Sequence, residues 1–109
     1  MMSVFNIESE EFAEKVLEKS EEKPVLVDFW ADWCQPCKQL SPVLDEVGQE
    51  YGDMVDVVKV NIDESRDKAM EYGVRSIPNV KLFIEGDVVG EFVGAKNKVE
   101  LVEWLEKKI

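Results

Sequence analysis

The sequence predicts a single α/β domain that spans residues 1–109. Two observations lead to this prediction. Apolar, strand-like runs alternate with amphipathic helical patterns through most of the chain, and a strand–turn–strand pattern followed by a helix ends it. A chain of 109 residues with 45% hydrophobic content supports one core without disulfide staples. No linker, internal repeat or low-complexity segment divides it.

The first half of the chain is expected to contain a helix, a buried strand and a longer helix, over Glu10–Lys19, Val25–Trp30 and Cys34–Glu50. Ser9 is the predicted N-cap of the first helix, and acidic residues fill its first turn. The strand is apolar almost throughout, which is typical of a central strand covered on both faces. Pro42 interrupts the second helix, so we expect either a kink or two shorter helices that meet at Ser41.

The second half is expected to contribute three strands and two helices. These are a strand from Val55 to Val60, a short helix over Ser65–Tyr72, strands over Val80–Ile84 and Val88–Val93, and a closing helix over Lys98–Lys108. Glu85-Gly86-Asp87 is typical of a hairpin turn between the last two strands. In the closing helix, Val99, Val102 and Leu105 are expected to face the core.

Charge and hydropathy exclude several classes of function. The formal net charge is −11, from 13 basic and 24 acidic residues, and a surface of this sign repels nucleic acid and anionic membranes. The high net charge also favours a monomer. Met1–Ile7 lacks the features of a signal peptide, and no apolar run has the length of a membrane span. We therefore expect a cytoplasmic protein that binds neither nucleic acid nor membranes.

The only two cysteines lie in one short motif, Trp33-Cys34-Gln35-Pro36-Cys37. Two thiols separated by two residues can close a disulfide and open it again, which is the chemistry of dithiol–disulfide exchange. A structural zinc site needs four ligands. Because the chain has no histidine, such a site would require thiolates shared in a dimer, or nearby carboxylates. A purely structural disulfide is a further alternative, but so short a loop stabilises a fold by only about 2 kcal/mol. We expect the pair to react.

The position of the motif assigns a role to each thiol. Cys34 lies where a helix begins, just after a buried strand, so its sulfur faces unpaired backbone N–H groups and the positive end of the helix dipole. Both favour the thiolate, which is the nucleophile. Cys34 is therefore expected to attack a substrate disulfide, and Cys37 to resolve the mixed disulfide.

Asp28 is an unusual residue for an apolar strand. If it lies beneath the start of the helix, burial raises its pKa and makes it a proton acceptor for Cys37 near neutral pH. The alternative is a solvated acid. Lys59, among valines of the next strand, either pairs with Asp28 or extends to solvent. The Ile77–Pro78 bond is expected to be trans on general frequencies.

Taken together, these motifs resemble the thioredoxin family over essentially the whole chain. The matching segments, in order, are Val27–Lys38, Pro42, Val58–Asp63, Tyr72–Pro78 and Val93–Ala95. The resemblance implies a central mixed sheet of about five strands flanked by about four helices, and a cis bond before Pro78. It also implies that Asp28 is a buried acid, with Lys59 near it.

The resemblance further implies a substrate-binding site and a set of partners. A flat apolar patch would receive an extended protein segment, and it consists of Trp33, Ile77, Pro78, Val93 and Gly94. The substrates would be protein disulfides, and a thioredoxin-reductase-type enzyme, linked to NADPH or ferredoxin, would restore the dithiol. No bound cofactor or metal is expected besides the redox-active disulfide.

The motif departs from the family at Gln35, where Gly is usual, while Pro36 is retained. Residues between the cysteines tune the reduction potential, so Gln35 and Pro36 are expected to influence it. Ser76 and Asn79 also replace common family residues beside Pro78. We expect a protein-disulfide reductase. The alternatives are glutaredoxin-like, oxidase or isomerase activity, a thiol sensor, and a redox-inactive binding module.

Overall fold

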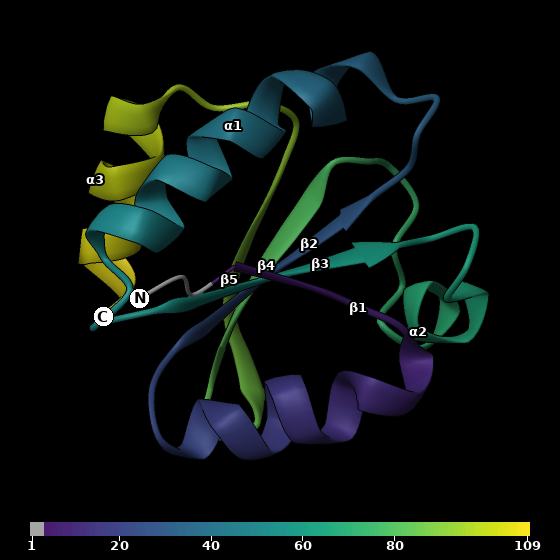
Figure 1. The fold of residues 1–109 in the computed structure, drawn as a ribbon, viewed down its shortest axis with the longest axis horizontal. Helices are drawn as coiled ribbons and strands as arrows, with labels where there is room; N and C mark the ends of the chain where they lie inside the picture. The colour runs from purple at the N-terminus through teal and green to yellow at the C-terminus, as the bar shows by residue number, and fades with distance from the viewer. Residues whose placement is uncertain (1–3) are drawn as a thin grey trace.

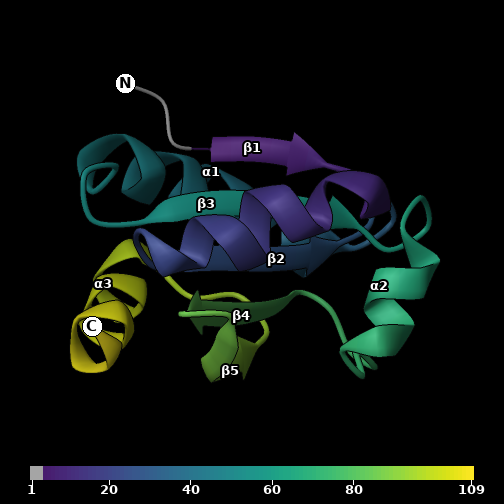
Figure 2. The ribbon, with the colours of Figure 1, turned by 90° about the horizontal axis from the view of Figure 1, so that it is seen from below.

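The fold is built on a five-stranded mixed sheet in the order β1-β3-β2-β4-β5 (Figure 2). The computed structural model describes residues 4–109, so residues 1–3 of the expected domain and of the amino-terminal segment lie outside the described part. The strands are β1 (Val4–Ile7), β2 (Val25–Trp30), β3 (Asp56–Asn61), β4 (Asn79–Ile84) and β5 (Asp87–Val93). β1, β3 and β2 are parallel, whereas β4 and β5 pair antiparallel.

Helices cover both faces of this sheet (Figure 1). On one face lie α1 (Gln35–Glu50) and α3 (Lys98–Lys108). On the other lie α2 (Arg66–Glu71) and a helical segment over residues 9–21, which combines 3₁₀ turns at its ends with a π-helical middle. This architecture confirms the expected α/β fold. Among the described residues, no helix is long and apolar enough to cross a membrane.

The alternation of side chains along β2 places the polar residue of that strand under α1. Val25, Val27 and Phe29 pack with the amino-terminal helical segment, while Leu26 packs with α1 and α3. Since side chains of a strand alternate between faces, Asp28 follows Leu26 on the α1 side. The same period in β3 places Lys59 on that side. Sheet geometry therefore brings both charged groups beneath one helix.

Two expectations about the elements were wrong, and one strand was not predicted. Ser9 is not an N-cap; it lies in the first 3₁₀ turn, and its hydroxyl donates to Asp67 of α2. Val99 of α3 is 67% exposed, and Leu101 takes the buried position instead. β1 was not predicted, because only four residues form it and it pairs with a single neighbour at the edge of the sheet.

The hairpin turn agrees with its prediction, whereas the trans bond expected before Pro78 was wrong. Glu85 and Gly86, with φ of 52° and 83°, form a two-residue hairpin turn between β4 and β5, as the primed turns of hairpins require. α1 runs through Pro42 as one helix, so the alternative of two helices is not observed. The Ile77–Pro78 bond is cis, as the family resemblance implied and general frequencies did not.

Candidate functional site

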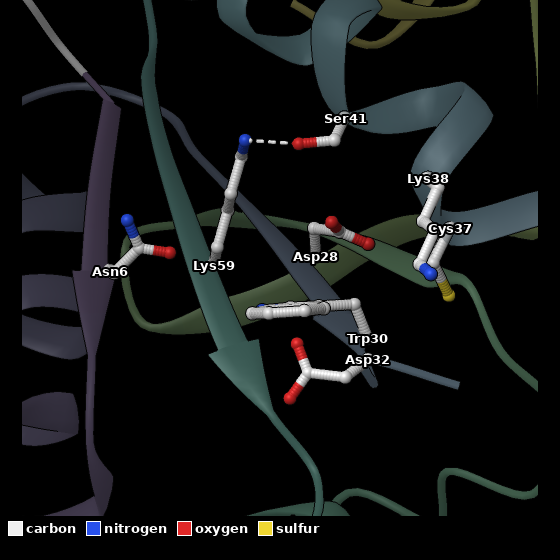
Figure 3. A pocket seen from close by; sticks show the side chains of 8 residues that line it. All are labelled: Asn6, Asp28, Trp30, Asp32, Cys37, Lys38, Ser41 and Lys59. Carbon is white, nitrogen blue, oxygen red and sulfur yellow. Dashed lines mark hydrogen bonds between the residues drawn. The ribbon is translucent and has the colours of Figure 1, made fainter. Parts of the chain in front are cut away.

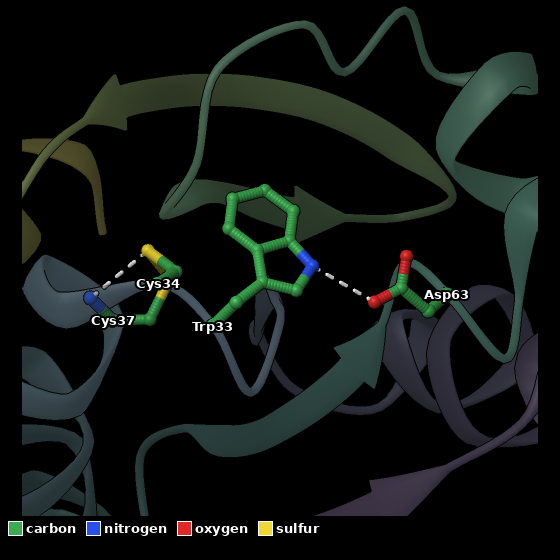
Figure 4. The surroundings of a disulfide bond; sticks show 4 residues. All are labelled: Trp33, Cys34, Cys37 and Asp63. Carbon is green, nitrogen blue, oxygen red and sulfur yellow. Dashed lines mark hydrogen bonds between the residues drawn. A yellow bond between two sulfur atoms is a disulfide. The ribbon is translucent and has the colours of Figure 1, made fainter.

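The two cysteines form a disulfide at the amino-terminal end of α1 (Figure 4). Cys34 is the N-cap, and its Sγ accepts a hydrogen bond of 3.2 Å from the backbone N–H of Cys37. Pro36 occupies the first turn, where a missing N–H costs no helical hydrogen bond. The helix terminus thus directs a backbone donor and the positive end of its dipole at the Cys34 sulfur, which favours a thiolate there.

The difference in exposure between the two sulfurs is small in this disulfide form. Cys34 is 4% and Cys37 is 2% exposed. The exposed residues of the motif are Trp33, Gln35 and Pro36. The surface of the motif is therefore formed by these three side chains and not by the two cysteines.

Asp28 lies buried beneath the disulfide, which excludes the alternative of a solvated acid. It is 1% exposed, and its Oδ1 has no hydrogen-bond partner among the residues that the structure describes. Burial raises the pKa of the Asp28 carboxyl from the ordinary 3.8 to about 7, although the positive charge of Lys59 opposes the increase. A carboxyl with a pKa near neutrality can both accept and release a proton under physiological conditions.

Asp28 and Cys37 both line a pocket of about 330 Å³ (Figure 3). Its lining comes from β1, β2, β3, α1 and the loop before α1: Asn6, Asp28, Trp30, Asp32, Cys37, Lys38, Ser41 and Lys59. The volume accommodates several water molecules, and the lining offers them polar partners. Asp28 and Cys37 therefore share one polar cavity.

Lys59 lies near Asp28, as the family resemblance implied, and its charge lowers the pKa of that carboxyl, but its direct contacts are with other groups. Its Nζ donates to Ser41 Oγ at 2.7 Å and pairs with Asp45 Oδ1 at 2.8 Å. Among the described residues it forms no ion pair with Asp28, its direct neighbour across the β2–β3 register. Ser41 and Asp45 were not predicted. Their signal was present, because Cys37, Ser41 and Asp45 recur every fourth residue and so share one face of the helix.

Trp33 lies beside the disulfide and is 67% exposed. Its indole Nε1 donates to Asp63 Oδ2 at 3.0 Å, which fixes the ring next to Cys34 (Figure 4). Asp63 was not among the predicted site residues. The sequence gives no local sign of this contact, since thirty positions separate the partners.

The other patch residues lie at one end of the β4–β5 pair. The backbone N–H of Gly94 donates to the carbonyl of Pro78 at 2.9 Å, and Val93 pairs with Asn79. Val93 is 56% exposed, Pro78 is buried, and Ile77 is half-buried. Gly94 has a φ of 96°, a conformation that favours glycine. A continuous patch that also includes Trp33 stays a prediction.

Replacing Trp33 by alanine is expected to lower kcat/KM for a protein disulfide by about tenfold, because exposed tryptophans at interfaces contribute strongly to binding. Reduction of a small linear disulfide such as oxidised β-mercaptoethanol should change by less than about twofold, since that substrate buries little surface. Steady-state kinetics with both substrates measure the difference. An equal loss on both would mean that Trp33 acts on the sulfur chemistry and not on docking.

Among residues 4–109, no group of three or more histidine, cysteine or acidic side chains is arranged to hold a metal ion. The sulfur pair and the buried carboxyl beneath it can support thiol–disulfide exchange coupled to proton transfer.

The chain is similar to thioredoxins over nearly all its length. The thioredoxin family model matches residues 3–107. The thioredoxin of Rickettsia prowazekii is 44% identical over 106 residues, which cover 97% of this chain and 99% of the relative. Thioredoxin 1 of Synechococcus elongatus is 50% identical over 98 residues, or 90% of each chain. The thioredoxin of Pseudomonas aeruginosa is 44% identical over 106 residues, or 97% of this chain and 96% of the relative.

Proposed function

This chain belongs to the thioredoxin family and carries out dithiol–disulfide exchange, and we propose that it works as a reductant of protein disulfides in the cytoplasm. The observation that carries the proposal is the Cys34–Cys37 disulfide at a helix N-terminus with a buried carboxyl beneath it. The protein is a thiol–disulfide oxidoreductase, and its redox-active group is made by its own side chains.

The proposed cycle begins with both cysteines reduced. The Cys34 thiolate attacks one sulfur of a substrate disulfide, forming a mixed disulfide and releasing one substrate thiolate. Cys37 then loses its proton and attacks Cys34 Sγ. The second substrate thiolate leaves, so the substrate has gained two electrons and the protein holds the Cys34–Cys37 disulfide. Protons taken up by the leaving thiolates complete the balance.

Asp28 is the proposed acceptor of the Cys37 proton. It lines the same pocket as Cys37, and its pKa of about 7 suits proton transfer at neutral pH. Lys59 modulates this acidity, because its positive charge lowers the pKa of Asp28 against the effect of burial. Gln35 and Pro36 adjust the environment of the Cys34 thiolate.

The proposed partners follow from the same cycle. Protein disulfides dock on Trp33 and on the end of the β4–β5 pair, and a thioredoxin-reductase-type donor, linked to NADPH or ferredoxin, restores the dithiol. Any flavin or nicotinamide would belong to that donor. The net charge of −11 supports a monomer that avoids nucleic acid and anionic membranes.

The reduction potential of the Cys34–Cys37 pair tests the direction of electron flow. We expect about −270 mV by equilibration with defined dithiol buffers and thiol alkylation, since thioredoxins lie there. A Gln35→Gly variant should differ by less than about 30 mV, a tenfold change in the equilibrium constant, because the Gln35 side chain is exposed. A value of about −180 mV or higher would instead support an isomerase or oxidase, with Gln35 stabilising the reduced form.

A further inference from the structure

The cation nearest in register to Asp28 is held away from it. Lys59 and Asp28 are direct neighbours on the parallel strands β2 and β3, and both side chains line the pocket under α1. Neighbouring strands lie about 4.8 Å apart, so a lysine has the reach to contact this carboxyl. The ammonium nevertheless lies on Ser41 Oγ at 2.7 Å and on Asp45 Oδ1 at 2.8 Å. Asp28 Oδ1 has no hydrogen-bond partner in the described part of the chain.

Two features of the contact make it specific. The Lys59 side chain is 9% exposed, so solvent screens its charge weakly, whereas that of Asp45 is 50% exposed. Both acceptors lie on the helix face that carries Cys37, one and two turns further along α1. We propose that Ser41 and Asp45 are positioning residues that hold the Lys59 ammonium on the helix side of the pocket and thereby limit how strongly its charge favours ionised Asp28.

The other groups around Asp28 do not take over the effect of Lys59 on its ionisation. The remaining charged or titratable residues of the pocket are Lys38 and Cys37 from α1 and Asp32 from the loop before it. Asn6 from β1 and Trp30 from β2 are uncharged, and Val80 of β4 lies opposite Asp28 in the register. Lys59 is the charge whose interaction with Asp28 counteracts the effect of burial. The position of the Lys59 ammonium therefore determines how strongly its charge favours the ionised form of Asp28.

The loss of one negative charge in Asp45→Asn predicts the direction in which the Asp28 titration midpoint moves. Replacing Asp45 by asparagine removes the negative charge that neutralises Lys59, so more positive potential reaches Asp28. It also removes a negative charge that opposes ionisation of Asp28 directly. Both changes favour the carboxylate, so the titration midpoint of Asp28 moves to lower pH.

The test is a carboxyl ¹³C NMR titration of Asp28 in the disulfide form of Asp45→Asn. We expect the midpoint to fall by about half a pH unit, the size expected of one partly exposed charge. Asp45→Glu should leave the midpoint near that of the parent. Glu46→Gln is the matched control: it changes the net charge equally on the same helix, but Glu46 faces Lys98 of α3 at 3.8 Å, so no shift is expected.

A double-mutant cycle shows whether Asp45 acts through Lys59. In a Lys59→Met background, Asp45→Asn should move the Asp28 midpoint by less than half the shift seen in the parent. An unchanged midpoint in Asp45→Asn would overturn the proposal, and so would a shift that persists fully without Lys59.

The inference rests on the proposed function only where it gives Asp28 a role in the resolving step, and the titration keeps the two separate. The disulfide form turns over no substrate, so the NMR midpoints report positioning of charge alone. If they move as expected while the reduced protein fails to reduce protein disulfides, the proposed function is wrong and the positioning stands. If the reduced protein reduces protein disulfides but the midpoints do not move, the proposed function stands and the positioning role of Ser41 and Asp45 is wrong.

Discussion

Replacing Cys34 by serine is expected to lower the rate of protein-disulfide reduction by at least about 10³-fold, because the nucleophile is removed and a serine hydroxyl is not ionised at neutral pH. The fold should survive, since serine is close in size to cysteine. The measurement is reduction of a disulfide-containing protein by the dithiol form, followed by alkylation of the new thiols. Circular dichroism verifies that the variant is folded.

Cys37→Ser is the matched variant, and it separates the two thiols by mechanism. Its Cys34 still attacks a substrate disulfide, but nothing resolves the product, so a stable mixed disulfide should accumulate on a non-reducing gel. Trapping at Cys37 in the Cys34→Ser variant would reverse the assigned roles.

If Cys34→Ser instead retained full biological function, the chain would act as a redox-inactive binding module. Slow exchange with protein disulfides but fast exchange with oxidants would favour a thiol sensor.

The elements that the sequence predicted well are those with strong, long patterns. The run Val25–Trp30 is apolar on both faces because helices cover both sides of β2, and α1 shows its buried stripe over four turns. β1 gave little signal because an edge strand of four residues buries only Ile7 fully. In α3, Val99 and Leu101 are both apolar and two positions apart, and only packing against α1 decides which is buried.

The candidate site was predictable where chemistry is local. Cys34 and Cys37 form a unit by spacing alone, and a carboxylate in an apolar strand marks Asp28 without any structure. The contacts that tune these groups join distant segments. Lys59 meets Ser41 and Asp45 across fourteen to eighteen positions, and Trp33 meets Asp63 across thirty. The four-residue spacing of Cys37, Ser41 and Asp45 indicates a shared helix face, but no pattern within one element pairs that face with Lys59 of another element. The sequence therefore left Lys59 between two alternatives.

Burial of Asp28 has a cost in stability that a single substitution should reveal. The folded protein titrates this carboxyl at about pH 7 and the unfolded chain near its ordinary 3.8. Between these values the folded state holds a proton that the unfolded chain has released, so the free energy of unfolding falls as the pH rises through this window. The full difference corresponds to roughly 4 kcal/mol above pH 7. The carboxyl that we propose as the acceptor of the Cys37 proton thus destabilises the fold above neutral pH.

Asp28→Asn is therefore expected to raise the free energy of unfolding by up to roughly 4 kcal/mol at about pH 8, and to give no gain at about pH 4, where Asp28 is protonated in the folded protein. Urea denaturation of the disulfide forms at both pH values measures the difference. Asp32→Asn is the control, because Asp32 lines the same pocket but is exposed, and its effect should stay within about 0.5 kcal/mol. A gain of equal size at both pH values would show that the amide stabilises by packing or hydrogen bonding and that the Asp28 charge is not the cause. A gain confined to high pH, together with slower resolution of mixed disulfides, would show that one buried proton links stability to catalysis in this protein.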